Sequence, residues 1–214
     1  MKRPPMLRTA AASLAGALTI GVLVGVYFVT AGVSARPQPG SIETFVAHTL
    51  RDMAIRPRVR GIANPVTASD AVIAEGRDHF ADHCATCHAN DGSGNTEMGK
   101  GLYPKAPDMR LPATQNLSDA ELFYIIENGV RFTGMPAWST GTAAGEESSW
   151  HLVHFIRHLP RLTPEEVETM ESLNPKSPEE IRQEIAAEQF LNGATAEPAA
   201  PSSPDSHEHG DHHE

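Results

Sequence analysis

The residues best suited to do chemistry in this 214-residue chain are its only two cysteines and the histidine that follows them. Cys84 and Cys87 are three positions apart and His88 comes next, giving the sequence C-A-T-C-H. A disulfide scaffold normally has several cysteines at longer spacings. A redox pair expects a βαβ context and a zinc site a second ligand pair, and neither is evident. C-x-x-C-H is instead the pattern of c-type haem attachment, in which both thiols bond the haem and the imidazole ligates iron.

Around this motif, residues 68–160 resemble a class I c-type cytochrome, of the bacterial monohaem kind similar to oxidase-associated cytochrome c subunits. The resemblance implies an all-α fold around one covalent haem c, with a helix before the motif crossing a terminal helix. Residues 71–84 are compatible with the first helix, opened by Ser69 or Asp70. Residues 146–159 carry apolar positions at helical spacing before Pro160 and are predicted to be the second. In the family layout, Gly76 and Phe80 meet the terminal helix, here through Leu152 and Phe155.

The second axial ligand of the iron is predicted to be a methionine, the usual choice of this family. Met135 lies in Gly134-Met135-Pro136-Ala137-Trp138, which looks like the family's methionine loop and follows a predicted helix over 118–128. Proline after the ligand stiffens such a loop, and glycine before it allows close backbone approach. Met98 is too near the motif to reach the far face. A core role for Met135 and a bis-histidine haem, through one of His79, His83, His151, His154 and His158, stay open as alternatives.

A proline is expected to hold the ligating imidazole in place. Met109 follows Pro107-Asp108, which looks like the family's proline loop, whose carbonyl accepts a hydrogen bond from Nδ1 of His88. Pro107 is the predicted residue and Pro104 the alternative. The spacing of His151, His154 and His158 resembles that of metal ligands, but a solvated or haem-edge face explains it more simply.

The chain before the haem domain predicts a membrane anchor. Thr9 to Ala35 contains no charged side chain and is long enough to cross a bilayer, with Lys2, Arg3 and Arg8 before it. This basic flank predicts an N-terminus inside and a haem domain on the periplasmic side of the cell membrane. A signal peptide cleaved after Val33-Ser34-Ala35 is the alternative. We therefore assign residues 1–36 to a single-pass anchor.

Residues 37–67 are expected to form a juxtamembrane helix and linker. Ser41 to Ala54 carries an apolar stripe at helical spacing and has arginines at its end. This helix is predicted either to pack on its own domain or to lie as a basic amphipathic segment on the membrane surface.

The C-terminal part of the chain holds the acidity. Residues 163–214 carry 13 acidic and two basic side chains, so that the rest of the chain is close to neutral. Two helices are predicted, 164–173 and 178–191, within an acidic appendage over 161–192. Residues 193–214 are predicted to be a disordered tail. Its final eight residues include four histidines and are therefore a candidate site for weak binding of divalent metal. A polar tail without a binding role, or an expression tag, could have the same composition.

Together these features predict an electron carrier rather than an enzyme. With His88 and Met135 on both axial positions, no coordination site is open for substrate, so no catalytic residue is assigned. The partners would be a redox donor and acceptor of a respiratory chain, whereas the acidic balance argues against nucleic acid. A haem subunit held permanently in an oxidase or dehydrogenase complex, and a haem sensor, are the alternatives.

Overall fold

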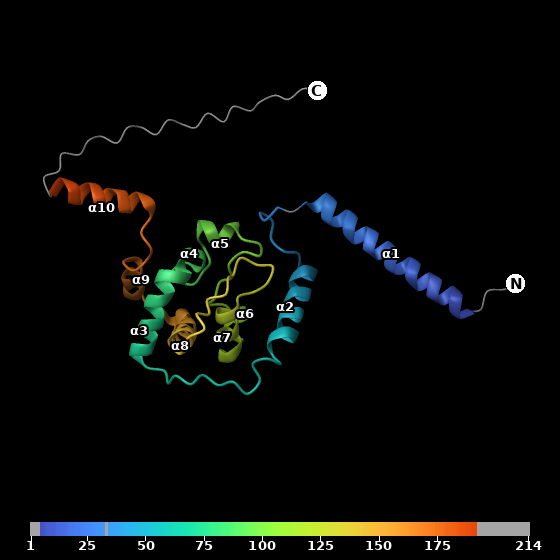
Figure 1. The fold of residues 1–214 in the computed structure, drawn as a ribbon, viewed down its shortest axis with the longest axis horizontal. Coiled ribbons are helices and arrows are strands. Elements are labelled where there is room, and N and C mark those ends of the chain that lie inside the picture. The colour runs from blue at the N-terminus through green and yellow to red at the C-terminus, as the bar shows by residue number, and fades with distance from the viewer. Residues whose placement is uncertain (1–4, 33, 192–214) are drawn as a thin grey trace, which may run out of the picture. The chain divides into compact units, whose positions relative to one another are not determined.

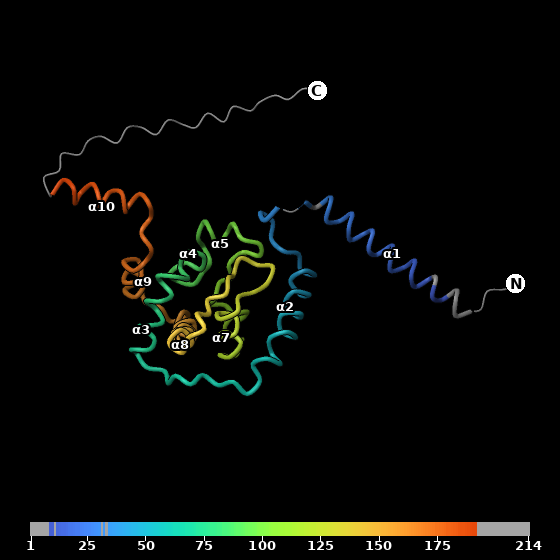
Figure 2. Tube along the Cα trace, viewed as in Figure 1, coloured from blue at the N-terminus to red at the C-terminus, as the bar shows by residue number. Residues whose placement is uncertain are grey.

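The structure is a computed structural model and describes residues 5–32 and 34–191. Within these ranges all regular secondary structure is helical and no strand forms, which confirms the expected all-α class. Figure 1 shows the helices in chain order, and Figure 2 traces the same path as a tube. The histidine-rich end, for which weak metal binding was expected, lies outside the described residues. The α-helices are α1 (Pro5–Ala31), α2 (Ser41–Ile55), α3 (Asp70–His79), α4 (Ala85–His88), α5 (Glu97–Gly101), α6 (Pro112–Gln115), α7 (Asp119–Asn128), α8 (Ala143–His158), α9 (Pro164–Glu171) and α10 (Pro178–Leu191).

The helix before the C-x-x-C-H motif has two parts. α3 begins after Ser69, whose side chain accepts a hydrogen bond from the backbone N–H of Val72. The α-helical hydrogen bonding ends at His79, and one π-helical turn continues from Phe80 to Cys84. The sequence predicts the helical course of this segment but not the wider turn, which is the kind of irregularity often found at functional sites.

α3 and α8 cross closely and form the centre of the core. Gly76 is buried at the crossing, where a Cβ atom would lie 3.0 Å from the Cβ of Phe155. One turn later the ring of Phe80 meets that of Phe155 with centroids 5.1 Å apart, and both side chains are fully buried. Leu152 is buried in the same cluster. The crossing thus follows the layout that the resemblance implied.

α7 lies against α8 and is capped at its start. The Ser118 side chain accepts from the N–H of Glu121, whose carboxylate accepts from the N–H of Ser118. The rings of Phe123 and Trp150 stack with centroids 4.0 Å apart. The capping box stabilises the start of α7, and the stacked rings hold the helix against α8 ahead of the loop that follows it.

α9 belongs with the same compact unit and not with α10. The chain divides after Asn174, and Met170 on α9 is fully buried in the core cluster. His158 on α8 also pairs with Glu166 on α9 at 2.9 Å. The acidic charge of both helices predicts a single appendage over residues 161–192. The structure differs because the burial of one methionine, which the charge pattern does not reveal, attaches α9 to the core. α10 lies in a separate unit that begins at Pro175, and its side chains are exposed.

α1 is the candidate membrane span. Ala12–Thr30 has a mean hydropathy of 2.0, and its side chains are exposed. Such a helix is compatible with membrane anchoring. A signal sequence near an N-terminus can also form an apolar helix that meets the same criterion.

Candidate haem site

The two cysteines and His88 lie on one short helical segment. Cys84 ends the π-helical turn, and α4 carries Cys87 and His88. Both cysteines are free thiols and half-buried. Burial, with a smaller contribution from neighbouring Cys87, raises the pKa of Cys84 to about 12, so this thiol is protonated at neutral pH. The segment therefore offers two free thiols one helical turn apart, the spacing at which both can add to the vinyl groups of one haem.

His88 is buried at the end of this segment. Its side chain is 8% exposed, and Nδ1 has no hydrogen-bond partner of good geometry among the described residues. Burial lowers the pKa of His88, and the backbone of Pro107 offsets part of that effect, so the imidazole is neutral and available as a ligand. The backbone of Pro107 thus lies near Nδ1 of His88, as the resemblance implied, although no hydrogen bond of good geometry joins them. Its positioning role stays a prediction.

Two glycines that the sequence analysis did not single out bring the proline loop onto the motif. The N–H of Gly94 donates to the carbonyl of His88 at 2.8 Å, and a Cβ at Gly94 would lie 2.4 Å from the oxygen of Ala106. A Cβ at Gly99 would lie 2.2 Å from the oxygen of Cys87. Only glycine permits both approaches. The cluster of glycines over 92–101 is the sequence feature that indicates close backbone approaches. It does not show which segment approaches each glycine, because that depends on the tertiary fold.

Met135 lies in a loop that folds back onto the end of α7. Its N–H donates to the Thr133 hydroxyl at 3.1 Å, and its carbonyl accepts from the N–H of Val130 at 3.1 Å. Gly129 ends α7 with a φ of 65°, and a Cβ there would lie 2.7 Å from the oxygen of Met135. Further on, the N–H of Trp138 donates to the carbonyl of Ile126 at 3.0 Å. Backbone contacts therefore hold the loop on both sides of Met135.

The other two methionines of residues 68–160 differ from Met135 in burial. Met109 is 9% exposed within the hydrophobic core, and Met98 on α5 is 55% exposed. Met135 is half-buried. Met109 is therefore a core residue and Met98 a surface residue, which leaves Met135 as the methionine in a preformed loop. Its role as a ligand stays a prediction.

The histidines of α8 do not gather into a metal site. His151 pairs with Glu75 and His158 with Glu166, each at 2.9 Å. His154 contacts the carbonyl of Val66 at 2.9 Å and the Asn64 amide at 3.0 Å. No group of three metal-ligating side chains occurs within the described part of the chain. Near the motif, burial and the neighbouring His83 lower the pKa of His79.

The residues present fit a covalent haem. Two free thiols, a buried neutral imidazole and a thioether in a constrained loop form the donor set of such a group. A comparison with known families points the same way. The family described as cytochrome c oxidase, cbb3-type, subunit III matches residues 71–156. The matched segment contains the motif, Pro107 and Met135, and ends within α8.

Proposed function

We propose, from the premise that residues 71–156 are a class I c-type cytochrome domain carrying covalently bound haem c, that this protein is a membrane-tethered monohaem electron carrier. It would pass single electrons between respiratory-chain partners outside the cytoplasmic membrane. Haem c supplies an iron that gains or loses one electron at a time. The observation that carries the proposal is the buried imidazole of His88 beside two free thiols inside the matched segment.

The roles of the chain's own residues follow from their positions. Cys84 and Cys87 would hold the haem covalently, and His88 would bind its iron through an imidazole that burial keeps neutral. Pro107 limits rotation of that ring from its Nδ1 side. Met135 would supply the second protein ligand of the iron, from a loop whose backbone is hydrogen-bonded on both sides of this residue. With two strong ligands the site carries electrons without binding a substrate.

α1 tethers this domain to the membrane. Its apolar stretch is long enough to span the hydrocarbon core, and basic residues precede it in the sequence. The basic flank favours an N-terminus inside and a haem domain on the periplasmic side. A tether of this kind keeps a carrier close to membrane-bound partners.

A redox titration of the purified holoprotein, with absorption spectra, tests the proposal. We expect one haem per chain, a one-electron transition, and a reduced form that does not bind carbon monoxide rapidly. Rapid binding of carbon monoxide to the reduced protein would overturn the carrier assignment and favour a haem sensor, because that reaction needs a weak or absent sixth ligand.

A second candidate function is that of a permanent subunit in a larger complex. The family match favours it, since the description of that family names an oxidase subunit. Purification in mild detergent separates the two cases. A stoichiometric complex that survives salt would support the subunit function, whereas a free holoprotein that exchanges electrons with separate partners would support the carrier.

A further inference from the structure

α2 places its apolar side away from the domain. Five large apolar residues recur at intervals of three or four, and this spacing puts them on one face of a helix. We call this the α2 stripe, and its members are strongly exposed. They are Ile42 (82%), Phe45 (71%), Val46 (46%), Leu50 (60%) and Met53 (68%).

Residues outside the stripe, on α2 and just past its end, make the contacts with the domain. Ile55 is buried in a small cluster with Val59 and Ala120. Arg56 pairs with Glu121 of α7 at 3.2 Å just past the end of the helix. Near its start, Glu43 accepts a hydrogen bond from the Tyr103 hydroxyl at 2.7 Å. Because contacts at both ends fix the helix, the stripe cannot turn inward without breaking them. A soluble helix normally has the reverse arrangement.

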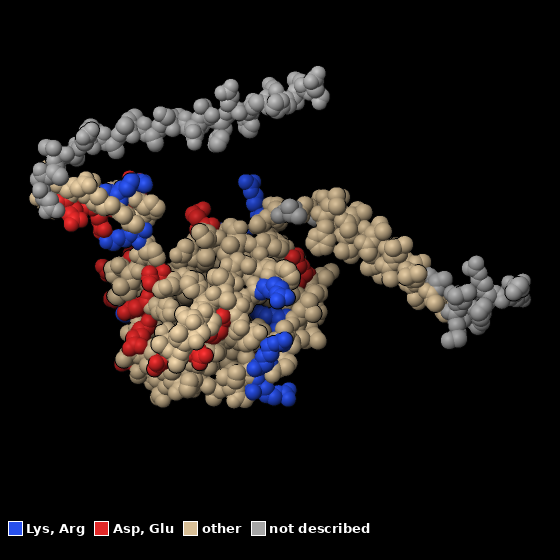
Figure 3. Space-filling view, in the orientation of Figure 1, with Lys and Arg blue, Asp and Glu red and all other residues tan. Residues whose placement is uncertain are grey.

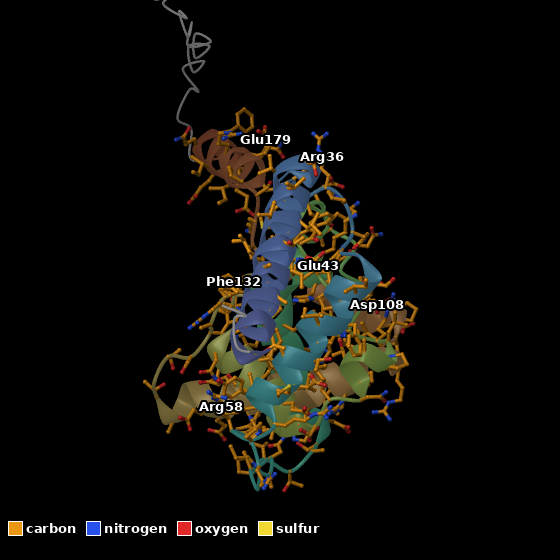
Figure 4. The ribbon with its side chains drawn as sticks, turned by 90° about the vertical axis from the view of Figure 1, so that its right-hand side faces the viewer. Arg36, Glu43, Arg58, Asp108, Phe132 and Glu179 are labelled. Atoms are coloured by element: carbon orange, nitrogen blue, oxygen red, sulfur yellow. The ribbon has the colours of Figure 1, made fainter. Side chains whose placement is uncertain are left out.

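The surroundings of α2 are basic in a chain that is acidic overall. Residues 36–60 hold five arginines and two acids, whereas the whole chain has a net charge of −10. Both acids are engaged, since Asp52 binds Arg51 and Arg56, and Glu43 binds Tyr103. Figure 3 shows basic side chains gathered over the lower part of α2. Figure 4 views this side, with Glu43 near the start of α2 and Arg58 just past its end. The charge suits an anionic surface.

The tether limits what can cover the stripe. α1 ends at Ala31 and α2 begins at Ser41, so the intervening chain can reach at most about 35 Å when fully extended. If α1 spans the bilayer, as the proposed function requires, α2 stays within that distance of the headgroups. An apolar face with basic neighbours on a short tether matches the pattern of interfacial helices.

We propose that the α2 stripe lies in the interface of an anionic bilayer and holds the haem domain with its α2 side toward the membrane. This inference rests on the anchoring role of α1. The membrane would then determine which side of the domain a partner meets, because tether and α2 together leave less rotational freedom than a tether alone. A protein partner on the stripe is the competing occupant.

Labelling by a photoactivatable phospholipid tests this placement. The full-length holoprotein is reconstituted in vesicles of phosphatidylcholine with phosphatidylglycerol, irradiated, and mapped by mass spectrometry. We expect labels on α1 and on residues 41–55, and fewer α2 labels in vesicles of phosphatidylcholine alone. The double variant Phe45→Glu, Leu50→Glu should reduce α2 labelling roughly tenfold or more while α1 labelling is unchanged.

A matched control adds the same charge beside the stripe. Ala47→Glu with Ala54→Glu changes two exposed residues of α2 outside the stripe and should leave most of the labelling in place. All four changed residues are exposed, and the haem spectrum of each variant reports whether the domain is intact. Labelled α1 with unlabelled α2 would overturn the inference and leave the anchor standing, whereas an unlabelled α1 would overturn the anchor itself. If α2 of the wild type is not labelled, and a protein partner binds the wild type and the control but not the stripe variant, then the stripe binds a protein and not the membrane.

Discussion

The backbone oxygen of His151 on α8 occupies the space that a side chain at Gly76 on α3 would need. A Cβ built at Gly76 lies 2.2 Å from that oxygen and 2.7 Å from the carbonyl carbon. Both atoms belong to the backbone of a buried helix, so neither can move as the end of a flexible side chain would. The approach of the two helices thus depends on the missing Cβ.

Gly76→Ala should destabilise the holoprotein by about 2–3 kcal/mol, because the added methyl group forces the two core helices apart. Chemical denaturation followed by circular dichroism measures this loss. Gly101→Ala is the control, since a Cβ at Gly101 meets nothing within 4 Å and its φ is not positive. Equal stability of the wild-type and Gly76→Ala proteins would show that the crossing is looser than described.

This crossing also shows which parts of the fold can be predicted from the sequence and which cannot. The spacing of Gly76 and Phe80 predicts that both lie on one face of the helix, because residues four apart share a side. That this face meets α8 is implied by the family resemblance. It does not predict the π-helical turn from Phe80 to Cys84, which depends on hydrogen bonding and not on side-chain pattern. α8 starts at Ala143, three residues before the predicted start, since Thr142 caps it ahead of the first apolar residue.

The candidate site likewise has features that the sequence predicts and features that it does not. The C-x-x-C-H motif predicts the haem chemistry from the sequence because the pattern is specific. Met135 as a ligand rests on the resemblance of its loop to that of the family. The approaches of Gly94 to Ala106 and of Gly99 to Cys87 cannot be predicted, since they depend on which distant loop passes by. The burial of Met170, which attaches α9 to the core, cannot be predicted from the sequence either, because it depends on how the helices pack.

Met135→Leu should lower the reduction potential and allow the reduced haem to bind carbon monoxide, because leucine removes the thioether that occupies the sixth position. Met109→Leu is the matched control. Met109 lies in the core, so its replacement should cost less than about 1.5 kcal/mol of stability and leave the spectrum unchanged. Redox titration with carbon monoxide difference spectra compares the two variants. A normal spectrum and potential in Met135→Leu would remove Met135 from the ligand set.

Glu166 should make the docking of α9 sensitive to acid. Burial opposes ionisation of this carboxyl, but the backbone N–H of Thr163 and the side chain of His158 together hold its pKa below the ordinary value. A carboxylate with a lowered folded-state pKa adds stability that is complete above its unfolded pKa of about 4.3 and is lost as pH falls below that value. α9 should therefore loosen in acid.

Glu166→Gln tests this, since glutamine keeps the cap but cannot ionise. At pH 7 we expect the variant to be less stable than wild type by up to about 1 kcal/mol. The difference should shrink toward zero in acid, as measured by denaturation over a pH series. Glu165→Gln, at an exposed neighbouring position, should follow the wild-type curve. A constant difference at all pH values would mean that the charge of Glu166 does not stabilise α9.

The backbone at Ala89, directly after His88, is in a conformation that glycine adopts far more readily. Its φ is 59° and its ψ is 157°, a region that costs a residue with a Cβ about 1–3 kcal/mol. Ala89→Gly should relieve that strain. Glycine also makes the unfolded chain more flexible, which costs about 0.5–1 kcal/mol of stability, so the free energy of unfolding should rise by up to about 2 kcal/mol in total.

A second position checks the same reasoning. Phe132 has a φ of 64° and is 93% exposed, and Figure 4 shows it at the edge of the molecule. Phe132→Gly gives up almost no packing, so it too should raise the free energy of unfolding, by up to about 2 kcal/mol on the same balance of strain and entropy. Denaturation of the two holoproteins measures both effects. Stability lost in both variants would contradict the strain argument. A loss in Ala89→Gly alone would mean instead that the Ala89 methyl group makes packing contacts worth more than the strain that it imposes.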